Sequence, residues 1–421
     1  MKTDRFGNPS AEALPYARGA ILTSTEDDFR KLQQAGRIIR RRISENGPEA
    51  IFNLTGLEHG LPLSGEDVPF AHDELAPALY TERLRRLTLE HLGGSPDRHD
   101  VMLFNRLTAA TLATHLVLVK PGAVVIGVSA SHSHPSVIRA AAHVGARLVD
   151  TKGVEEFTAV MEREREVALV VLTRLAVTYE ALSVEALQQI VRLAHERDIL
   201  VYADEAGGAR VGPAILEQPR MLELGVDLGA TGLDKYGTSG PRVGLMAGEK
   251  QLVARIRARA WEFGLEARPL LYPAVIRSLE AYTPERVQAL VDSTKQVAAA
   301  LRALLGSRIH ETPVIAELPA DDILELILER AGLSTAPQAP IVPYEAAAAL
   351  AMLLLQDYGI LAVHFAALPP GTADFLFKFM PPDTVKRFGG PAAFAQAIDA
   401  SLHKLAGLAT RPEHIRQLLF G

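Results

Sequence analysis

The chain has 421 residues, a formal net charge of −6, and 48% hydrophobic and 22% charged residues. This composition is typical of a globular protein of two or three domains, and the negative charge does not favour nucleic acid as a partner. The sequence contains no cysteine, which excludes disulfides, thiolate nucleophiles and Cys-ligated metals, and no metal site is expected. The N-terminus lacks the apolar stretch of a signal peptide, and the longest apolar run (346–355) is about half a membrane span. We therefore expect a cytoplasmic protein without a membrane partner.

The first predicted element is an amphipathic helix over 27–45. We interpret its basic cluster at 40–42 as a solvent-exposed face, and the alternative is that the cluster binds a phosphate or an acidic partner. Residues 51–77 are rich in Gly and Pro and predict a loop. A helix-period segment over 80–92 follows.

Short apolar runs then alternate with helix-period segments up to residue 248. The predicted strands are 101–104, 123–128, 146–150, 167–173, 199–204, 226–232 and 243–248. Of the predicted helices between them, the first ends at Val119, and the others cover about 135–145, 153–166 and 183–197. Continuous apolar runs of this kind indicate strands buried on both faces. The sequence therefore predicts an α/β fold with a mostly parallel seven-stranded sheet.

The C-terminal part predicts a smaller α+β domain. A long helix is expected over 273–305, and later strand candidates are 314–319, 360–365 and 374–379. The expected organisation is an N-terminal helical segment (1–50) that packs on the small domain, a large domain (51–270), a connecting helix (271–305) and the small domain (306–421).

Polar side chains follow the carboxyl ends of the predicted strands, which is where open parallel sheets bind ligands. They are Asn105–Thr108, Ser129–His134, Thr173 with Arg174, Asp204–Ala206, and Thr231 with Asp234 and Lys235. Such a concentration of titratable and polar groups at one sheet edge predicts a functional site there.

Lys235 is the most informative of these residues. The chain has 10 lysines among its 44 basic residues, so most of its cationic positions carry arginine. Arginine cannot form a Schiff base, whereas lysine can once its ammonium is destabilised. Lys235 is thus a candidate imine-forming residue, although a surface lysine is the plain alternative.

Asp204 ends an apolar strand, where a buried carboxylate needs a partner. If Lys235 holds pyridoxal phosphate (PLP), Asp204 can keep the pyridine nitrogen protonated, and a protonated ring is an effective electron sink. Ala206 is small enough to lie beneath a ring. The alternative for Asp204 is a cap on the following turn or helix.

The other expected cofactor contacts come from the loops at the same edge. Asn105, Arg106, Leu107 and Thr108 begin a helix whose free N–H groups can cradle a phosphate. Thr231 and Arg242 are expected to add phosphate contacts, and Thr173 completes the set. His134 can stack on the cofactor and move protons, with His132 as its rival.

In this order along the chain, the set resembles the fold type I PLP enzymes, the aspartate-aminotransferase-like superfamily. The resemblance covers about residues 50–265. The segments DKYGTSGPRVGLMAG (234–248) and FNLTGLEHG (52–60) are similar to bacterial selenocysteine synthase and the sugar-acid ammonia-lyases. The segment 173–210 is similar to the ornithine, lysine and arginine decarboxylases, but Gly207 stands where those enzymes carry a histidine.

The resemblance also implies a substrate site and an oligomer. Related aminotransferases bind the substrate carboxylate with an arginine on a late strand, where this chain has Lys378. Arg174 and Arg242 are further expected substrate contacts, and Arg268 and Arg387 are rivals. Members are at least homodimers, and Tyr272, Arg268 or the 56–70 loop is expected to reach a partner's site.

The expected function is that of a PLP-dependent lyase or transferase. It would act on a small amino acid by elimination or replacement at the β-carbon through a Lys235 aldimine, with Lys235, Asp204 and His134 as catalytic residues. The enzyme alternatives are an amino-acid decarboxylase, an aldolase or an aminotransferase. The non-enzyme alternative is a degenerate PLP-fold binding protein. A nucleotide-binding enzyme without PLP is disfavoured because neither GxGxxG nor GxxxxGK[ST] occurs.

Overall fold

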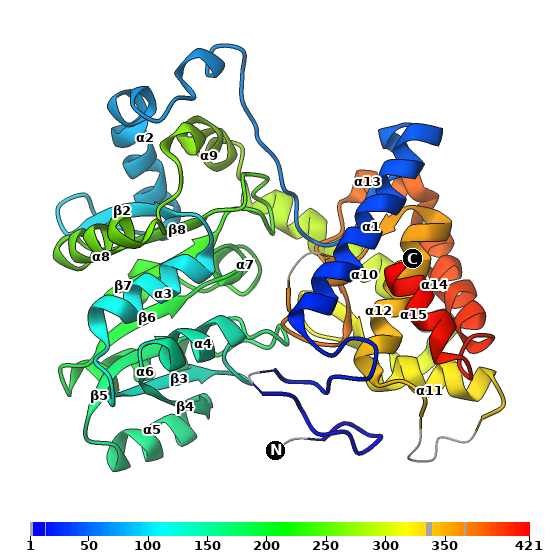
Figure 1. The fold of residues 1–421 in the computed structure, drawn as a ribbon. Coiled ribbons are helices and arrows are strands. Elements are labelled where there is room, and N and C mark those ends of the chain that lie inside the picture. Colours follow the sequence, from blue (N-terminus) through cyan, green and yellow to red (C-terminus); the bar gives the residue numbers. More distant parts are fainter. Residues whose placement is uncertain (1–2, 13, 334–338, 366–367) are drawn as a thin grey trace. The chain divides into compact units, whose positions relative to one another are not determined.

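The computed structural model describes residues 3–12, 14–333, 339–365 and 368–421 (Figure 1). The chain divides into two compact units, one of Glu58–Gln288 and one of Met1–Leu57 with Ala289–Gly421. The larger unit thus continues past residue 270, where we expected it to end. It does so because α9 (Tyr272–Glu280) packs against α2 (Leu75–Leu92) within the same unit.

The larger unit contains the predicted seven-stranded sheet, in the order β2-β8-β7-β6-β5-β3-β4. The strands are β2 (His99–Phe104), β3 (Val124–Ser129), β4 (Arg147–Lys152), β5 (Val167–Leu172), β6 (Leu200–Asp204), β7 (Leu228–Gly232) and β8 (Gly244–Glu249). β3 to β7 pair in parallel, whereas β8 is antiparallel to both β2 and β7. The α/β fold class with a mostly parallel sheet is confirmed.

Helices cover both faces of this sheet (Figure 1). In β5, Leu169 and Val171 point into one apolar cluster, and Val170 and Leu172 point into the other. Period-two alternation between two buried faces explains why the strands read as continuous apolar runs. Side chains from α3 (Leu107–Leu118), α4 (Pro135–His143) and α8 (Lys250–Phe263) fill the first cluster. Those from α2, α5 (Gly153–Arg163), α6 (Val184–His195) and α9 fill the second, and α7 (Gly208–Ile215) follows β6.

Two arginines cover part of the sheet edge at β2. Arg85 of α2 donates to the carbonyl of His99 at 3.1 Å, and Arg257 of α8 donates to the carbonyl of Val101 at 2.9 Å. Both guanidinium groups pair with Asp100, at 3.4 Å and 2.6 Å. Arginine side chains therefore occupy edge carbonyls that a further strand would use.

The helix expected over 273–305 is two helices, α9 and α10 (Pro284–Leu305). The break falls at Pro284, because a proline lacks the N–H that a continuing helix requires and restricts the residue before it. α9 belongs to the larger unit, and most of α10 belongs to the smaller one.

The smaller unit combines helices with two short sheets. Its helices are α1 (Thr25–Asn46), α10, α11 (Ala320–Arg330), α12 (Pro343–Leu353), α13 (Pro382–Phe388), α14 (Gly390–Ala406) and α15 (Pro412–Phe420). β9 (His310–Glu311), β10 (Ile315–Leu318) and β12 (Phe375–Lys378) form one antiparallel sheet, and β1 (Phe52–Asn53) pairs in parallel with β11 (Ile360–Leu361). Of the expected strand 360–365, only β11 forms, because 363–365 turn into a 3-10 helix.

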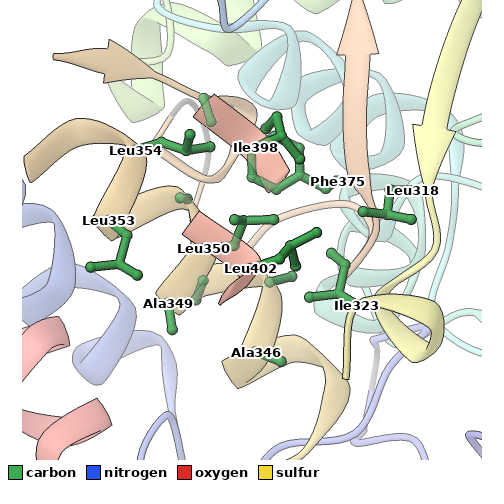
Figure 2. Close-up of a cluster of buried hydrophobic side chains, with 14 of the residues drawn as sticks. Leu318, Ile323, Ala346, Ala349, Leu350, Leu353, Leu354, Phe375, Ile398 and Leu402 are labelled. Atoms are coloured by element: carbon green, nitrogen blue, oxygen red, sulfur yellow. The ribbon is translucent and has the colours of Figure 1, made fainter. Parts of the chain in front are cut away.

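The core of the smaller unit surrounds α12, as Figure 2 shows. Leu350 and Ala346 of α12 lie among Leu318, Phe375 and Leu402 from three other elements. Every residue of α12 is buried, so the apolar run at 346–355, most of which lies in α12, belongs to the core. Within the described residues, no helix has both the length and the apolar character needed to cross a bilayer.

A buried polar cluster attaches α1 to this unit. Asp28 accepts from Arg18 at 2.8 Å and from the hydroxyl of Tyr344, and it lies 3.7 Å from the ammonium of Lys31. Lys31 also donates to the Tyr344 hydroxyl at 3.2 Å. Burial lowers the pKa of Lys31 to about 8, although Asp28 opposes the shift.

Candidate active site

Lys235 follows β7 in the loop that leads to β8. Its Nζ lies 3.4 Å from Oδ1 of Asp234, and the lysine side chain is 18% exposed. A largely buried amine that still reaches solvent at a sheet edge has the accessibility that a bond-forming lysine requires.

Three cationic or ionisable side chains lie close to the carboxylate of Asp234. Besides Lys235, its Oδ2 lies 3.1 Å from Nε2 of His59 and 3.5 Å from Nε of Arg242. Burial would raise the pKa of Asp234, but Lys235, His59 and Arg242 outweigh it and hold that pKa well below its usual range. Asp234 is therefore a carboxylate that stabilises positive charge at this edge of the sheet.

Asp204 ends β6, the strand next to β7, and its side chain is 3% exposed. Its Oδ1 is buried without a hydrogen-bond partner among the described residues. Burial raises the pKa of Asp204 to about 7, the charge of Glu205 adds to this shift, and Lys235 opposes it. A buried carboxyl group with an unused oxygen indicates a cationic or N–H ligand at this position.

Arg174 does not lie where a substrate can reach it. Its side chain is fully buried, with Nε donating to Glu205 at 2.8 Å and Nη1 donating to the carbonyl of Pro219 at 2.6 Å. A Cβ at Gly212 would overlap its guanidinium group. These contacts argue against the expected substrate contact and make Arg174 the partner that fixes Glu205 beside Asp204.

Thr231 is also turned away from solvent. Its hydroxyl accepts from Nη2 of Arg210 at 3.0 Å and donates to the carbonyl of Ala206 at 3.3 Å. The same Nη2 donates to the carbonyls of Ala206 and Gly232, at 3.1 Å and 2.7 Å. Arg210, which sequence reasoning did not single out, therefore joins the ends of β6 and β7. A direct phosphate contact from the Thr231 hydroxyl, as we expected, competes with these bonds.

The helix start that we expect to hold a phosphate is the start of α3, with Arg106 as its N-cap residue. The backbone of Gly244 lies so close to Arg106 and Leu107 that a Cβ there would meet their backbone at 2.7–2.8 Å. Burial and the charge of Arg106 lower the pKa of Arg242. The charge of Arg106 and the N–H groups of the first helical turn favour an anion, and a phosphate contact at this helix start stays a prediction. Asn105 instead donates from its side chain to the carbonyl of Gly264 at 3.1 Å.

His134 caps α4, where its Nδ1 accepts from the backbone N–H of Ser136 at 3.1 Å. His132 precedes it in the same loop, and the structure does not decide which of the two rings faces a cofactor. Thr173 is 4% exposed, and its hydroxyl has no hydrogen-bond partner among the described residues. Thr173 thus follows β5 as a second unused polar group at this edge.

The remaining expected substrate and interface residues come from both units. Lys378 is a buried residue of β12 in the smaller unit. Arg387, an exposed residue of α13 in the same unit, donates to the backbone carbonyls of Glu49 and Ile51. Arg268 is exposed and pairs with Asp73. Tyr272 begins α9.

Sequence reasoning also missed two buried tyrosines, Tyr179 and Tyr236, whose hydroxyls bond to each other. His59 was passed over because it lies in a loop far from Lys235 in sequence. The one available signal was Tyr236, an aromatic residue directly after the lysine in a Gly-rich segment. Among the described residues, no three His, Asp or Glu side chains converge as a metal-binding group.

Comparisons with known proteins agree with the fold. A pyridoxal phosphate-dependent protein of the UPF0425 family from Methanothermobacter thermautotrophicus is 30% identical over 405 residues, covering 95% of this chain and all of the relative. A second UPF0425 protein, from Methanosphaera stadtmanae, is 29% identical over 87% of this chain and 92% of its own length. The chain therefore belongs to the UPF0425 family of pyridoxal phosphate-dependent proteins. No family model matches the sequence.

Solved structures share the architecture at low sequence identity. Serine palmitoyltransferase from Sphingomonas wittichii has a TM-score of 0.58 at 16% identity, covering 85% of this chain and 88% of that chain. N-succinyldiaminopimelate aminotransferase from Mycobacterium tuberculosis has a TM-score of 0.55 at 17% identity, covering 90% and 97%. The predicted fold type I PLP architecture is confirmed, and PLP as cofactor is confirmed at the level of the family. The finer resemblance to selenocysteine synthase stays a prediction.

The residues present fit this cofactor. The unused oxygen of Asp204 suits a protonated ring nitrogen, Lys235 supplies the amine, and the α3 N-terminus with Arg106 suits a phosphate. Each group comes from the carboxyl end of the sheet or the start of the following helix.

Proposed function

We propose that this chain is a PLP-dependent enzyme that acts on a small amino acid by elimination or replacement at the β-carbon. Lys235 binds the cofactor, and Asp204 pairs with its ring nitrogen. The observation that carries the proposal is the buried Asp204 carboxyl group, whose Oδ1 has no partner in the described part of the chain and which interacts electrostatically with Lys235.

The cofactor, when bound, stores the electron pair released as a bond at the α-carbon of the amino acid breaks. The protein's part is to hold charge and move protons. The Lys235 amine is the group that takes or returns a proton at the α-carbon. Asp234 keeps positive charge favourable beside it, and Arg242, 36% exposed in its side chain, is the substrate-carboxylate ligand of this unit that we favour. Lys378, in the smaller unit, is the other candidate ligand for the substrate carboxylate.

The preference for β-elimination or replacement rests on the sequence around Lys235. The segment 234–248 resembles enzymes that cleave or replace a bond at the β-carbon, whereas Gly207 departs from the histidine of the decarboxylases. The leaving group that suits this chemistry is a hydroxyl, phosphate or sulfur-type group. The product is then ammonia with a keto acid, or a substituted amino acid.

The test begins with the absorbance spectrum of the purified protein after addition of PLP. We expect a visible absorbance band in the wild type that borohydride removes, with the cofactor recovered on the peptide containing residue 235. Lys235→Ala should lack the band, and Asp204→Ala should bind PLP with lower affinity. A wild type that stays colourless with added PLP would contradict the proposal and favour a binding protein.

A screen of small amino acids then identifies the reaction. Release of ammonia and a keto acid, or formation of a substituted amino acid, supports action at the β-carbon. Release of carbon dioxide would indicate a decarboxylase, release of an aldehyde an aldolase, and amino transfer to a keto acid an aminotransferase. Each of these three results contradicts the proposed reaction while leaving the cofactor assignment intact.

We also propose a homodimer or higher homo-oligomer. Large apolar side chains are exposed in neighbouring segments around the start of α2, which supports a protein contact there. They are Leu61, Val68, Phe70, Leu75 and Leu79, with exposed fractions from 42% to 59%. Light scattering after size-exclusion chromatography decides between a monomer and an oligomer, and Leu75→Glu with Leu79→Glu should shift an oligomer towards the monomer.

A further inference from the structure

The residue that follows Lys235 is held in an uncommon backbone conformation. Tyr236 has φ of 54° and is 5% exposed, and Tyr179, from the loop after β5, has φ of 62° and is 7% exposed. Left-handed backbone is rare for bulky residues and persists only where the surroundings hold it. The two hydroxyls are bonded to each other, with ring centroids 6.1 Å apart. The contact thus joins the loops after β5 and β7.

Gly207 makes room for this arrangement. A Cβ at Gly207 would overlap the ring of Tyr236. Gly207 lies between Asp204 and α7, so the Tyr236 ring fills the space that a side chain at 207 would take. The departure from the decarboxylase pattern at this position therefore has a steric cause in this chain.

A second hydrogen bond extends the connection to a third loop. The hydroxyl of Thr178, next to Tyr179, donates to the hydroxyl of Ser131 in the loop after β3 at 2.9 Å. On the other side, the carbonyl of Lys235 accepts from the hydroxyl of Thr238 at 2.8 Å. Rotation of the Tyr236 backbone out of the left-handed region would turn the peptide that carries this carbonyl.

We infer that Tyr179, Tyr236 and Gly207 form a lock that positions Lys235 against Asp234 in this protein. The inference deepens the proposed function, since it assumes that Lys235 is the cofactor lysine. The tyrosines act through the loop backbone, so they are positioning residues.

The experiment measures Lys235 in protein freed of PLP. Trinitrobenzenesulfonate labels the neutral amine, and mass spectrometry of the peptide containing residue 235 gives the labelling rate as a function of pH. The variants are Tyr179→Phe, Tyr236→Phe, their double variant and Gly207→Ala. Tyr202→Phe is the matched control, because Tyr202 is also a buried tyrosine of this unit and its hydroxyl bonds to Thr111 at 3.1 Å.

Each single Phe variant should label Lys235 about two- to tenfold faster at neutral pH, the range that the loss of one hydrogen bond corresponds to. The double variant should show less than the sum of the single effects, because either substitution alone already breaks the bond between the two hydroxyls. Gly207→Ala should behave alike, and Tyr202→Phe should leave the profile at the wild-type position.

Additive single effects, or a labelling rate of Lys235 that is unchanged in every variant, would overturn the lock. Gly207→Ala has to be checked by circular dichroism, and if it fails to fold, the cycle of Phe variants decides alone. Titration of PLP into the same proteins separates the two proposals. A wild type that does not bind PLP at Lys235 refutes the proposed function, whereas the labelling cycle in PLP-free protein still tests the lock.

Discussion

Arg174 and Glu205 form an ion pair inside the larger unit, with Nε and Oε1 2.8 Å apart and the side chains 0% and 1% exposed. Buried ions lose their hydration, so each depends on the other for compensation. Glu205 directly follows Asp204, and its negative charge contributes to the raised pKa of that carboxyl group. The pair therefore links the stability of the sheet edge to the protonation of the candidate site.

Removal of one partner of this pair should be strongly destabilising. We expect Arg174→Met to lower the free energy of unfolding by about 3–5 kcal/mol, because Glu205 is left buried without a counter-ion. The double variant Arg174→Met with Glu205→Leu should recover much of this loss. Denaturation by urea, followed by circular dichroism, measures both. Arg86→Met, which breaks the exposed 3.5 Å pair with Glu90, is the control and should change stability by less than about 1 kcal/mol. A single variant as mild as this control would contradict the prediction.

Asp204 should make the PLP-free protein less stable as pH rises. Its folded pKa of about 7 exceeds the unfolded value of about 3.9, so between these values the folded state binds more protons than the unfolded state. Stability is therefore lost progressively from about pH 4 to about pH 7, by up to about 4 kcal/mol. Asp204→Asn removes this contribution, and the difference between the two unfolding free energies should shrink or change sign at low pH. Parallel slopes for the two proteins across this range would refute the assignment.

We expect Lys31 to have the opposite effect in alkaline solution, where its contribution to the free energy of unfolding should increase with pH. Its folded pKa of about 8 lies below the unfolded value of about 10.4, so the unfolded state binds more protons between them. The contribution to stability therefore rises from about pH 8 to about pH 10. Tyr344, whose pKa is raised by burial and by Asp28, stays protonated in this window. Thermal denaturation of the wild type and of Lys31→Met from pH 7.5 to 10 measures the difference, and an equal pH dependence of both proteins would count against it.

Arg210 should not tolerate replacement by lysine. Its Nη2 contacts two carbonyls and the Thr231 hydroxyl in fully buried surroundings, and a single ammonium cannot keep the guanidinium geometry. We expect Arg210→Lys to lose about 2–4 kcal/mol of stability and to weaken PLP binding, because β6 and β7 carry Asp204 and precede Lys235. Urea denaturation and PLP titration measure the two effects. Lys250→Arg, at the start of α8, serves as the conservative control. Wild-type stability in Arg210→Lys would show that Nη2 contributes little.

The strands of the large sheet could be predicted because their signal is local. Most of the strands are short apolar runs such as VALVVLT, as expected where helices cover both faces of a sheet, and the charged edge strand β4 is the exception. Lys235, Asp204 and the start of α3 could also be predicted to lie at one edge of the sheet, because each of them ends or follows a predicted strand. Pro284 was a local signal too, and weighing it would have divided the helix expected over 273–305.

The roles of Arg174, Thr231 and Arg210 could not be predicted in this way. Their positions at strand ends or in the following helix are visible in the sequence, but the direction of each side chain depends on contacts with distant segments. Arg174 turns towards Pro219, and Arg210 turns back to β7. The contact between Tyr179 and Tyr236 likewise depends on two separate loops folding against each other.

The arginines at β2 bear on how this protein behaves when it is concentrated. An unpaired strand edge invites another chain to add to the sheet, which is a route to fibrous aggregates. Arg85 and Arg257 already occupy the carbonyls of His99 and Val101. The opposite edge strand, β4, carries Arg147, Asp150 and Lys152, whose charges disfavour the stacking of like strands. Both borders of a strongly apolar sheet are thereby protected against self-association through the backbone.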